Sequence, residues 1–415
     1  MEVLRIATSG SVDDGKSTLI GRLLYDTNSI PQDKMDALHA ASKRKGLDFT
    51  DLSLLTDGLV AEREQGITID VAHIYFSTPT RKYIIADTPG HIEYTRNMVT
   101  GASNAQVSLI LIDARRGIVE QTHRHFFIAN LLRIPYLVVC VNKMDLVEYS
   151  EARFNQIVED FQQMLDNAGF KGQAVKFIPI SSLYGENVAS HTGAIDWYQG
   201  ETLLEYLEQV SFDHEDRLHP SRFPIQSVIR PRTTEHHDFR GFAGKVASGH
   251  FTVGDEVISL PSGQKSRIKT IDQFEKQLTV AHARESVVIS LEDEIDSSRG
   301  NMLVKTSEVP VQLKEISADI CWMDQQNLVS GKTYLLQHGV NRVKAKVQQI
   351  NYVTDVTNHV QVTGKTEMGL NDIGRISLKT AAPIFADAYH TNPANGAFIL
   401  IDEFNNRTVA VGFII

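Results

Sequence analysis

The feature that most constrains the fold is a glycine-rich segment near the start of the chain. Residues 10–17 read Gly-Ser-Val-Asp-Asp-Gly-Lys-Ser and match the phosphate-binding P-loop pattern. The apolar run 4–8 precedes this segment, and leucine and isoleucine at positions 19, 20, 23 and 24 share one helical face after it. Strand, loop and helix in this order let backbone N–H groups and the positive helix end face an anion. A glycine-rich turn before an ordinary helix is the alternative reading, and two further motifs argue against it.

Two later motifs follow in the order that a guanine-nucleotide hydrolase requires. Residues 87–91 read Asp-Thr-Pro-Gly-His, and residues 142–145 read Asn-Lys-Met-Asp. Each motif comes just after an apolar run of strand length, at 83–86 and 136–141. Open α/β sheets bind ligands outside the carboxyl ends of their strands. The three motifs therefore predict one site, with GTP and Mg²⁺ as its ligands.

Apolar runs of strand length alternate with helix-like segments along the first half of the chain. Further runs lie at residues 107–112 and 177–180. This alternation is typical of a doubly wound, mostly parallel sheet. The predicted fold class is an α/β P-loop GTPase domain followed by two β-barrel domains, because short β-rich runs separated by turn residues dominate from residue 223 onward. The predicted domains are the GTP-binding domain 1–212, a first barrel 223–308 and a second barrel 309–415.

Composition narrows the classes of partner. The chain of 415 residues has 41 basic and 51 acidic residues, a formal charge of −10, which argues against a surface built for non-specific nucleic-acid contacts. Cys140 and Cys321 lie in apolar runs without a metal-binding spacing, so both are predicted to be reduced core residues. No apolar run approaches membrane-spanning length and no leader precedes the first strand, so we predict a cytoplasmic protein without a membrane partner.

On the phosphate side, each predicted role follows from the chemistry of the residue. Lys16 is expected to meet the β- and γ-phosphates and to assist catalysis, while Ser17 and Asp87 are expected to hold Mg²⁺ directly and through water. Thr68 is expected to complete the metal site from a loop. Without the neighbouring motifs, it would be interpreted as a strand residue. The predicted phosphate-side contacts are Gly10, Ser11, Val12, Asp13, Asp14, Gly15, Lys16, Ser17, Thr18, Asp87, Thr88, Pro89, Gly90 and His91.

The residues after Pro89 are predicted to link GTP hydrolysis to a conformational change. Gly90 can present its N–H to the γ-phosphate and rotate when that phosphate leaves, because it has no side chain. His91 follows it directly and is the predicted catalytic residue that orients the attacking water, with a surface histidine as the alternative. Two other histidine pairs, at positions 123 and 125 and at 236 and 237, are predicted to be solvated.

On the base side, an acidic residue gives selectivity. Asp145 can accept hydrogen bonds from the N1–H and the amine of guanine, which adenine does not offer there. Asn142 is expected to hold the loop, and the stem of Lys143 is expected to cover the base. A turn after the run 177–180 is placed to offer backbone N–H groups to guanine O6. The predicted base-side contacts are Asn142, Lys143, Met144, Asp145, Ser181, Ser182 and Leu183.

These motifs resemble the GTPase subunit of bacterial sulfate adenylyltransferase, also called ATP sulfurylase, with elongation factors of the Tu type as wider kin. The resemblance is carried by residues 10–26, by Asp14 where elongation factors show histidine, and by residues 57–72, 84–91 and 94–98. It extends over the whole chain, including residues 254–257. One departure is the pair Ile92-Glu93, where the family carries two polar residues.

The resemblance implies a heterodimer or higher assembly in which a smaller catalytic subunit makes adenylyl sulfate and pyrophosphate from ATP and sulfate. This chain would hydrolyse GTP to drive that step, and no adenylylsulfate kinase activity is expected. Two rival interpretations remain open. One is a translation factor that delivers aminoacyl-tRNA, and the other is a regulatory GTP sensor without a coupled enzyme.

Overall fold

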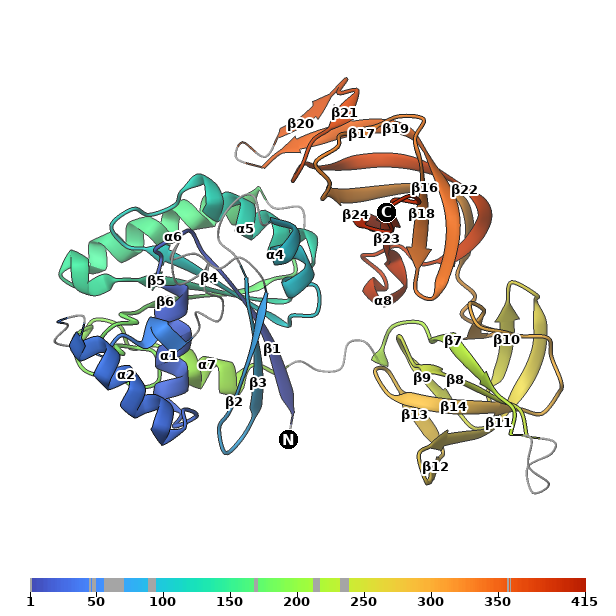
Figure 1. The fold of residues 1–415 in the computed structure, drawn as a ribbon, viewed down its shortest axis with the longest axis horizontal. Helices are drawn as coiled ribbons and strands as arrows, with labels where there is room; N and C mark the ends of the chain where they lie inside the picture. Colours follow the sequence, from blue (N-terminus) through green and yellow to red (C-terminus); the bar gives the residue numbers. More distant parts are fainter. Residues whose placement is uncertain are drawn as a thin grey trace. The chain divides into compact units, whose positions relative to one another are not determined.

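A computed structural model describes residues 2–44, 46, 50–55, 71–88, 95–167, 171–211, 217–231, 239–356, 358 and 360–415 of the chain (Figure 1). The chain divides into two compact units. The first comprises Met1–Ser211 with the short segment Val356–His359, and the second comprises Phe212–Asp355 with Val360–Ile415. Within the described residues, no helix is both long and apolar enough to cross a membrane.

The first unit is built on a six-stranded sheet. Its strands run in the order β2 (Ala72–Ser77), β3 (Lys82–Asp87), β1 (Val3–Ser9), β4 (Val107–Asp113), β5 (Tyr136–Asn142) and β6 (Ala174–Pro179). Neighbouring strands are parallel except β2 and β3, which are antiparallel. The central strand β4 is buried along its whole length, as its continuous apolar sequence requires.

Helices cover both faces of this sheet. They are α1 (Lys16–Asp26), α2 (Gln32–Arg44), α4 (Thr95–Ala102), α5 (Glu120–Leu131), α6 (Glu151–Asp166) and α7 (Leu203–Gln209), with short 3₁₀ turns η1 (Leu52–Leu55) and η3 (Met144–Val147). Figure 1 shows α4, α5 and α6 on one face and α1 and α7 on the other. Helix α6 begins at a favourable cap, because the Ser150 hydroxyl accepts the N–H of Arg153 at 3.3 Å. This is the predicted doubly wound architecture.

The second unit contains two closed barrels of six strands. The first has the order β10 (Glu256–Leu260), β15 (Met302–Lys305), β7 (Arg222–Ile229), β8 (Gly241–Lys245), β14 (Ser286–Leu291) and β11 (Gln264–Gln273), and β10 pairs with β11 to close it. Strand β12 (Lys276–Leu278) extends β11, and β9 (His250–Thr252) pairs with β13 (Val280–His282). Phe223, Phe242 and Phe251 lie in its core.

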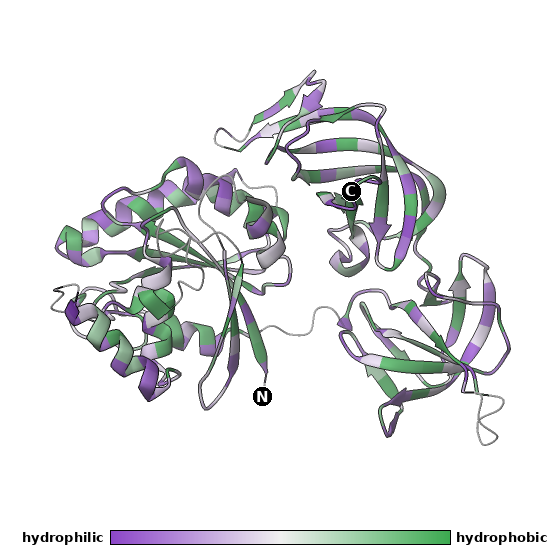
Figure 2. Cartoon of the chain, in the orientation of Figure 1, coloured by the Kyte–Doolittle hydropathy of each residue, from purple (hydrophilic) through white to green (hydrophobic). Residues whose placement is uncertain are grey.

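The second barrel has the order β18 (Thr333–His338), β23 (Ala397–Ile401), β24 (Thr408–Ile414), β16 (Val311–Trp322), β22 (Ile373–Ala386) and β19 (Asn341–Asp355), closed by pairing of β18 with β19. Strand β20 (Val360–Thr363) extends β19, β17 (Leu328–Val329) pairs with β21 (Glu367–Met368), and the short helix α8 (Pro393–Gly396) precedes β23. Polar and apolar residues alternate along the long strands, so apolar side chains fill the interior (Figure 2).

These elements confirm the predicted fold class, an α/β GTPase domain followed by two β-barrels. Cys140 and Cys321 are buried free cysteines, as predicted. Both barrels lie within one compact unit, so the predicted boundary at residues 308 and 309 remains a prediction. Arg222 of β7 and Asp387, just after β22, form a buried ion pair that ties one barrel to the other.

Candidate functional site

The phosphate loop connects β1 directly to α1. Gly15 has a positive φ of 95°, and a side chain there would bring a Cβ within 2.5 Å of the Asn142 amide nitrogen. The loop closes on itself, because the Ser11 N–H donates to the Asp14 carboxylate at 2.5 Å and the Asp14 N–H donates to the Ser11 carbonyl at 3.2 Å. Burial raises the pKa of Asp14. The loop therefore has the compact backbone geometry that the motif predicts.

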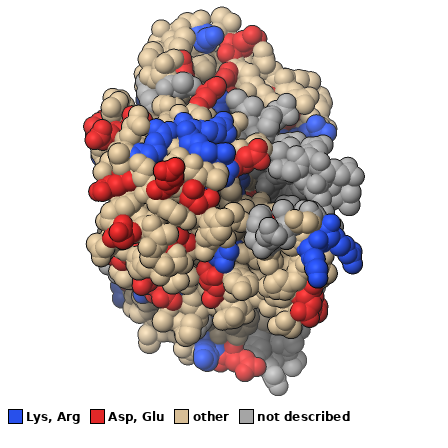
Figure 3. Space-filling model, turned by 90° about the vertical axis from the view of Figure 1, so that its left-hand side faces the viewer, with Lys and Arg blue, Asp and Glu red and all other residues tan. Residues whose placement is uncertain are grey.

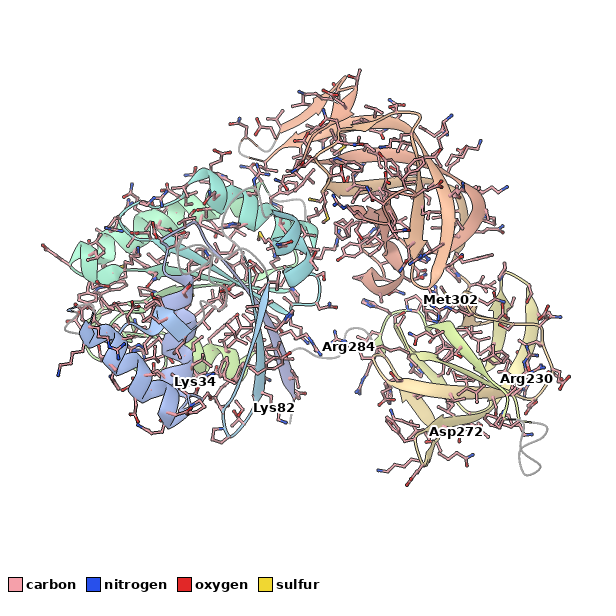
Figure 4. The ribbon with its side chains drawn as sticks, in the orientation of Figure 1. Lys34, Lys82, Arg230, Asp272, Arg284 and Met302 are labelled. Carbon is pink, nitrogen blue, oxygen red and sulfur yellow. The ribbon has the colours of Figure 1, made fainter. Side chains whose placement is uncertain are left out.

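Lys16 lies inside this loop. Its side chain is buried, with a residue exposure of 8%, and its ammonium donates to the carbonyls of Gly10 at 2.8 Å and Ser11 at 3.2 Å. Burial lowers the pKa of Lys16, and the charges of Asp87 and Asp14 oppose that shift. By contrast, Lys34 and Lys82 lie at the surface (Figure 4). A cation held this way is placed to meet an anion entering the loop.

A second group of polar residues joins the ends of β1 and β3. Asp87 is buried at the end of β3, where its carboxylate accepts the Thr8 hydroxyl at 3.1 Å. The Thr88 hydroxyl donates back to the Thr8 carbonyl. Ser17 stands in the first turn of α1, and its hydroxyl makes no hydrogen bond to another described residue. The two predicted metal-binding groups within the described residues are thus at the same edge of the sheet.

The remaining phosphate-side residues divide into two groups. Val12 and Thr18 are half-buried, and Ser11 is buried with a hydroxyl that has no hydrogen-bond partner among the described residues. Thr68, Pro89, Gly90 and His91 lie outside the described residues, so their predicted roles remain predictions. Within the described part of the chain, no cluster of three or more His, Cys, Asp or Glu side chains could hold a metal.

Asn142 links the phosphate side to the base side. Its amide nitrogen donates to the Asp14 carbonyl at 2.7 Å, while its amide oxygen accepts the N–H of Ser182 at 3.0 Å and the Ser182 hydroxyl at 2.9 Å. Both side chains are buried. One residue therefore fixes the distance between two loops that are far apart in sequence.

Lys143 and Asp145 flank the predicted position of the base. Lys143 has a positive φ of 62°, and its ammonium donates to the Asp13 carbonyl and pairs with Asp113 at 3.0 Å. Asp145 is half-buried and accepts the Ser181 hydroxyl at 2.6 Å. Met144 is buried, and its N–H donates to the Ile180 carbonyl at 3.2 Å. The structure thus brings together Asn142, Lys143, Asp145 and the turn at Ser181 and Ser182, with Leu183 half-buried beside them.

Sequence patterns did not identify Asp113, a buried residue at the end of β4. Its carboxylate accepts two hydrogen bonds from the Arg115 side chain, at 3.0 and 2.6 Å, in addition to the ion pair with Lys143. Burial alone would raise the pKa of Asp113, but the hydrogen bonds from Arg115 and Lys143 outweigh burial and hold that pKa far below its usual value. Asp113 therefore stays ionised and anchors Lys143.

The prediction that the histidines of α5 are solvated is wrong for His125. This residue is buried, with an exposure of 3%, because it shares the buried face of α5 with Thr122, Phe126 and Ala129. Their spacing of three and four residues is the signal that could have identified it. His123 is half-buried, and residues 236 and 237 lie outside the described residues. Burial, aided by the charges of Lys16 and Arg124, lowers the pKa of His125 to about 3.

Comparison with known proteins decides the family. The elongation factor Tu GTP binding domain matches residues 1–212, and the GTP-eEF1A C-terminal domain-like family matches residues 315–415. Sulfate adenylyltransferase subunit 1 of Bacteroides fragilis is 47% identical over 416 residues, covering 100% of this chain and 86% of that protein. This chain belongs to the sulfate adenylyltransferase subunit 1 family.

Other sequences place the chain in the same family. Sulfate adenylyltransferase subunit 1 of Aliivibrio fischeri is 47% identical over 414 residues, covering 99% of this chain and 86% of that protein. The bifunctional enzyme CysN/CysC of Mycobacterium tuberculosis is 48% identical over 414 residues, covering 100% of this chain and 67% of that protein. A crystal structure of sup35 complexed with GDP overlaps with a TM-score of 0.45 and 22% identity, a likeness too weak to carry an argument. The resemblance predicted from the motifs is therefore confirmed.

Proposed function

We propose that this member of the sulfate adenylyltransferase subunit 1 family binds Mg²⁺ and GTP and hydrolyses GTP to drive adenylyl sulfate formation on a smaller partner subunit. The observation that carries the proposal is the position of Asn142, which ties the phosphate loop to the turn that follows β6. Because of this link, the phosphate and base ends of the proposed nucleotide site would be held at a fixed separation.

On the phosphate side, the described residues fit a triphosphate. Lys16 is buried against the neutral loop carbonyls, and a bound anion would supply the opposite charge that these carbonyls lack. Ser17 and Asp87 would hold Mg²⁺, and phosphate oxygens and waters would complete its shell, as this ion prefers. Magnesium would neutralise charge on the phosphates.

On the base side, Asp145 keeps hydrogen-bonding capacity for guanine. One of its oxygens accepts the Ser181 hydroxyl, and an ionised carboxylate has about four acceptor positions. Guanine N1–H and the exocyclic amine can use the remainder. An adenine base would offer no donor at these places and would leave the carboxylate unpaired.

Three residues outside the described part complete the proposal. Thr68 and Gly90 would contact the γ-phosphate side of the site, and His91 would orient the attacking water. Loss of the γ-phosphate would release the two segments that carry them. The partner subunit would recognise either the held or the released arrangement of these segments. GTP hydrolysis would in this way change the interaction with the partner.

The division of labour follows from the motifs present. The chain has one phosphate loop, and Asp145 commits it to guanine, so adenylyl transfer from ATP would occur on the partner. A phosphate-sulfate anhydride is less stable than the phosphoanhydride that it replaces. Its formation therefore requires a linked reaction, and GTP hydrolysis would be that reaction.

Reconstitution tests the proposal. Adenylyl sulfate formation from ATP and sulfate is measured with the smaller subunit alone, with this chain, and with this chain plus GTP or GDP. We expect GTP to raise the yield, GDP to leave it unchanged, and Lys16→Ala to remove both GTP binding and the stimulation while the subunits still assemble. Equal yields with and without GTP would contradict the coupling, and tight binding of aminoacylated tRNA instead would favour a translation factor.

A further inference from the structure

Arg22 of α1 contacts the turn on the base side of the site. Its Nε donates to the Ser182 carbonyl at 3.3 Å, and one of its terminal nitrogens donates to the Leu183 carbonyl at 2.5 Å. These contacts span 160 and 161 residues of sequence. Helix α1 begins at Lys16, so one rigid element carries the phosphate-side lysine and an arginine that holds the base-side turn.

The surroundings hold the guanidinium in one orientation. Asp26 lies one turn further along α1, with its carboxylate 3.7 Å from the guanidinium, and the ring of Tyr25 has its centroid 5.4 Å from it. Gly185 has a φ of 82°, and a Cβ there would lie 3.5 Å from the Arg22 stem. The Arg22 side chain is only 17% exposed. A planar fork fixed in this way loses little entropy when it binds two carbonyls.

The two carbonyls determine where the neighbouring N–H groups point. In a planar trans peptide the C=O and the following N–H point in opposite directions. Because Arg22 holds the Ser182 carbonyl, the N–H of Leu183 points away from α1. Asn142 already uses the N–H of Ser182, whereas the Leu183 N–H donates to no other described residue. The Leu183 N–H is therefore a fixed, unused donor.

We infer that Arg22 is a positioning residue for guanine recognition, which orients the Ser182–Leu183 peptide so that the Leu183 N–H meets O6 of the base. This inference rests on the proposed guanine site. Helix α1 would then position the base-side turn as well as the phosphate loop. Arg22 itself does not touch the nucleotide.

The test compares diphosphates whose bases keep or lack O6. Inosine also lacks the exocyclic amine and 2-aminopurine also lacks N1–H, so each variant is compared with wild type on the same ligand. Calorimetry on the full chain gives dissociation constants for GDP, for inosine diphosphate, which keeps O6, and for 2-aminopurine riboside diphosphate, which lacks it. We expect Arg22→Ala to raise the dissociation constants of GDP and inosine diphosphate about tenfold. A loss of this size is typical of a hydrogen bond supported by a charged group. The dissociation constant of the analogue without O6 should rise by less than about twofold.

Two further variants make the test decisive. Arg22→Lys keeps the charge but loses the fork, so it should fall between wild type and Arg22→Ala, and it replaces Arg22→Ala if that variant does not fold. Arg44→Ala, at an exposed position of α2, is the matched control and should bind all three ligands like wild type. Equal weakening of all three ligands by Arg22→Ala, or no weakening of GDP, would overturn the inference. If wild type shows no preference for GDP over ADP, the proposed function fails instead.

Discussion

Lys16 in the first unit and Arg222 in the second are both buried cations, but their surroundings differ. Arg222 is 2% exposed, and it donates to both Asp387 oxygens at 2.9 and 2.8 Å and to the carbonyls of Ser221 and Glu308 at 2.9 and 2.7 Å. Lys16 contacts two loop carbonyls and forms no ion pair with a described carboxylate. Burial lowers its pKa.

Arg222 has a structural role, whereas under the proposed function Lys16 serves a ligand. The Asp387 carboxylate also accepts hydrogen bonds from Asn392 and Asn395, both at 2.9 Å, so the ion pair between the barrels is compensated on both sides. Removing one partner of such a pair leaves the other charge buried and unpaired. Lys16 contacts neutral carbonyls, and under the proposed function a bound phosphate would supply its opposite charge. Charges of both signs are interspersed on the molecular face in Figure 3, whereas Lys16 and Arg222 are buried.

The largest expected effect is on the stability of the second unit. Arg222→Ala should lower the free energy of unfolding by about 3–5 kcal/mol, because the Asp387 side chain, only 11% exposed, would lose its cation. Chemical denaturation followed by fluorescence measures the loss. Arg267→Ala in the same barrel is the control, since its ion pair with Glu256 is exposed and should contribute less than about 1 kcal/mol. Equal losses for the two variants would remove the distinction drawn for Arg222.

Lys16→Met should lower ligand affinity without lowering stability, unlike Arg222→Ala. We expect GTP affinity to fall by about 3 kcal/mol, because a charge-assisted contact to the phosphates is lost. The free energy of unfolding should stay the same or rise, since a buried ammonium with incomplete compensation is replaced by an apolar side chain of similar length. A destabilisation as large as that of Arg222→Ala would show that Lys16 is a structural ion after all.

Asp145→Asn should change base preference more than stability. The amide can donate where the carboxylate only accepted, so we expect binding to shift from guanine toward xanthine nucleotides by about 2 kcal/mol. Competition between GDP and xanthosine diphosphate for the variant measures the shift. Retained preference for GDP would count against Asp145 as the base-reading residue.

The smallest effect expected near neutral pH is a pH dependence from His125. Its folded pKa of about 3 is below the unfolded value of 6.5, so between these values the unfolded chain binds a proton that the folded chain does not. Stability should therefore fall as the pH drops below 6.5, by at most about 1.4 kcal/mol per pH unit for this one group. His125→Gln should flatten the slope of unfolding free energy against pH. The buried His338 in the second unit, whose pKa burial also lowers, is expected to leave a residual slope in that variant.

Local sequence patterns predicted the motif residues of the site but not the long-range contacts between them. The P-loop, Asp87, Asn142 and Asp145 are recognisable because each has a fixed place after a buried strand. Arg22 and Asp113 are not, since no spacing rule connects an arginine of α1 to carbonyls 160 residues away, or an acid at the end of β4 to Lys143. These contacts exist only once the strands are ordered in the sheet.

Two other features also depended on tertiary structure. Strand β2 pairs antiparallel at the edge of the sheet, and its mostly half-buried and exposed residues give a weak apolar signal. His125 is buried because α5 packs this face against the sheet, where burial of the neighbouring apolar side chains outweighs the cost of desolvating the imidazole. In both places the packing environment, and not residue type, decided the outcome.

Titration of the full chain with Mg·GDP and Mg·ADP in a calorimeter tests the central claim most directly. A guanine site with Asp145 at the base and a buried Lys16 at the phosphates predicts tight binding of GDP and at least about 100-fold weaker binding of ADP. Comparable binding of both nucleotides, or tight binding of ADP alone, would contradict it.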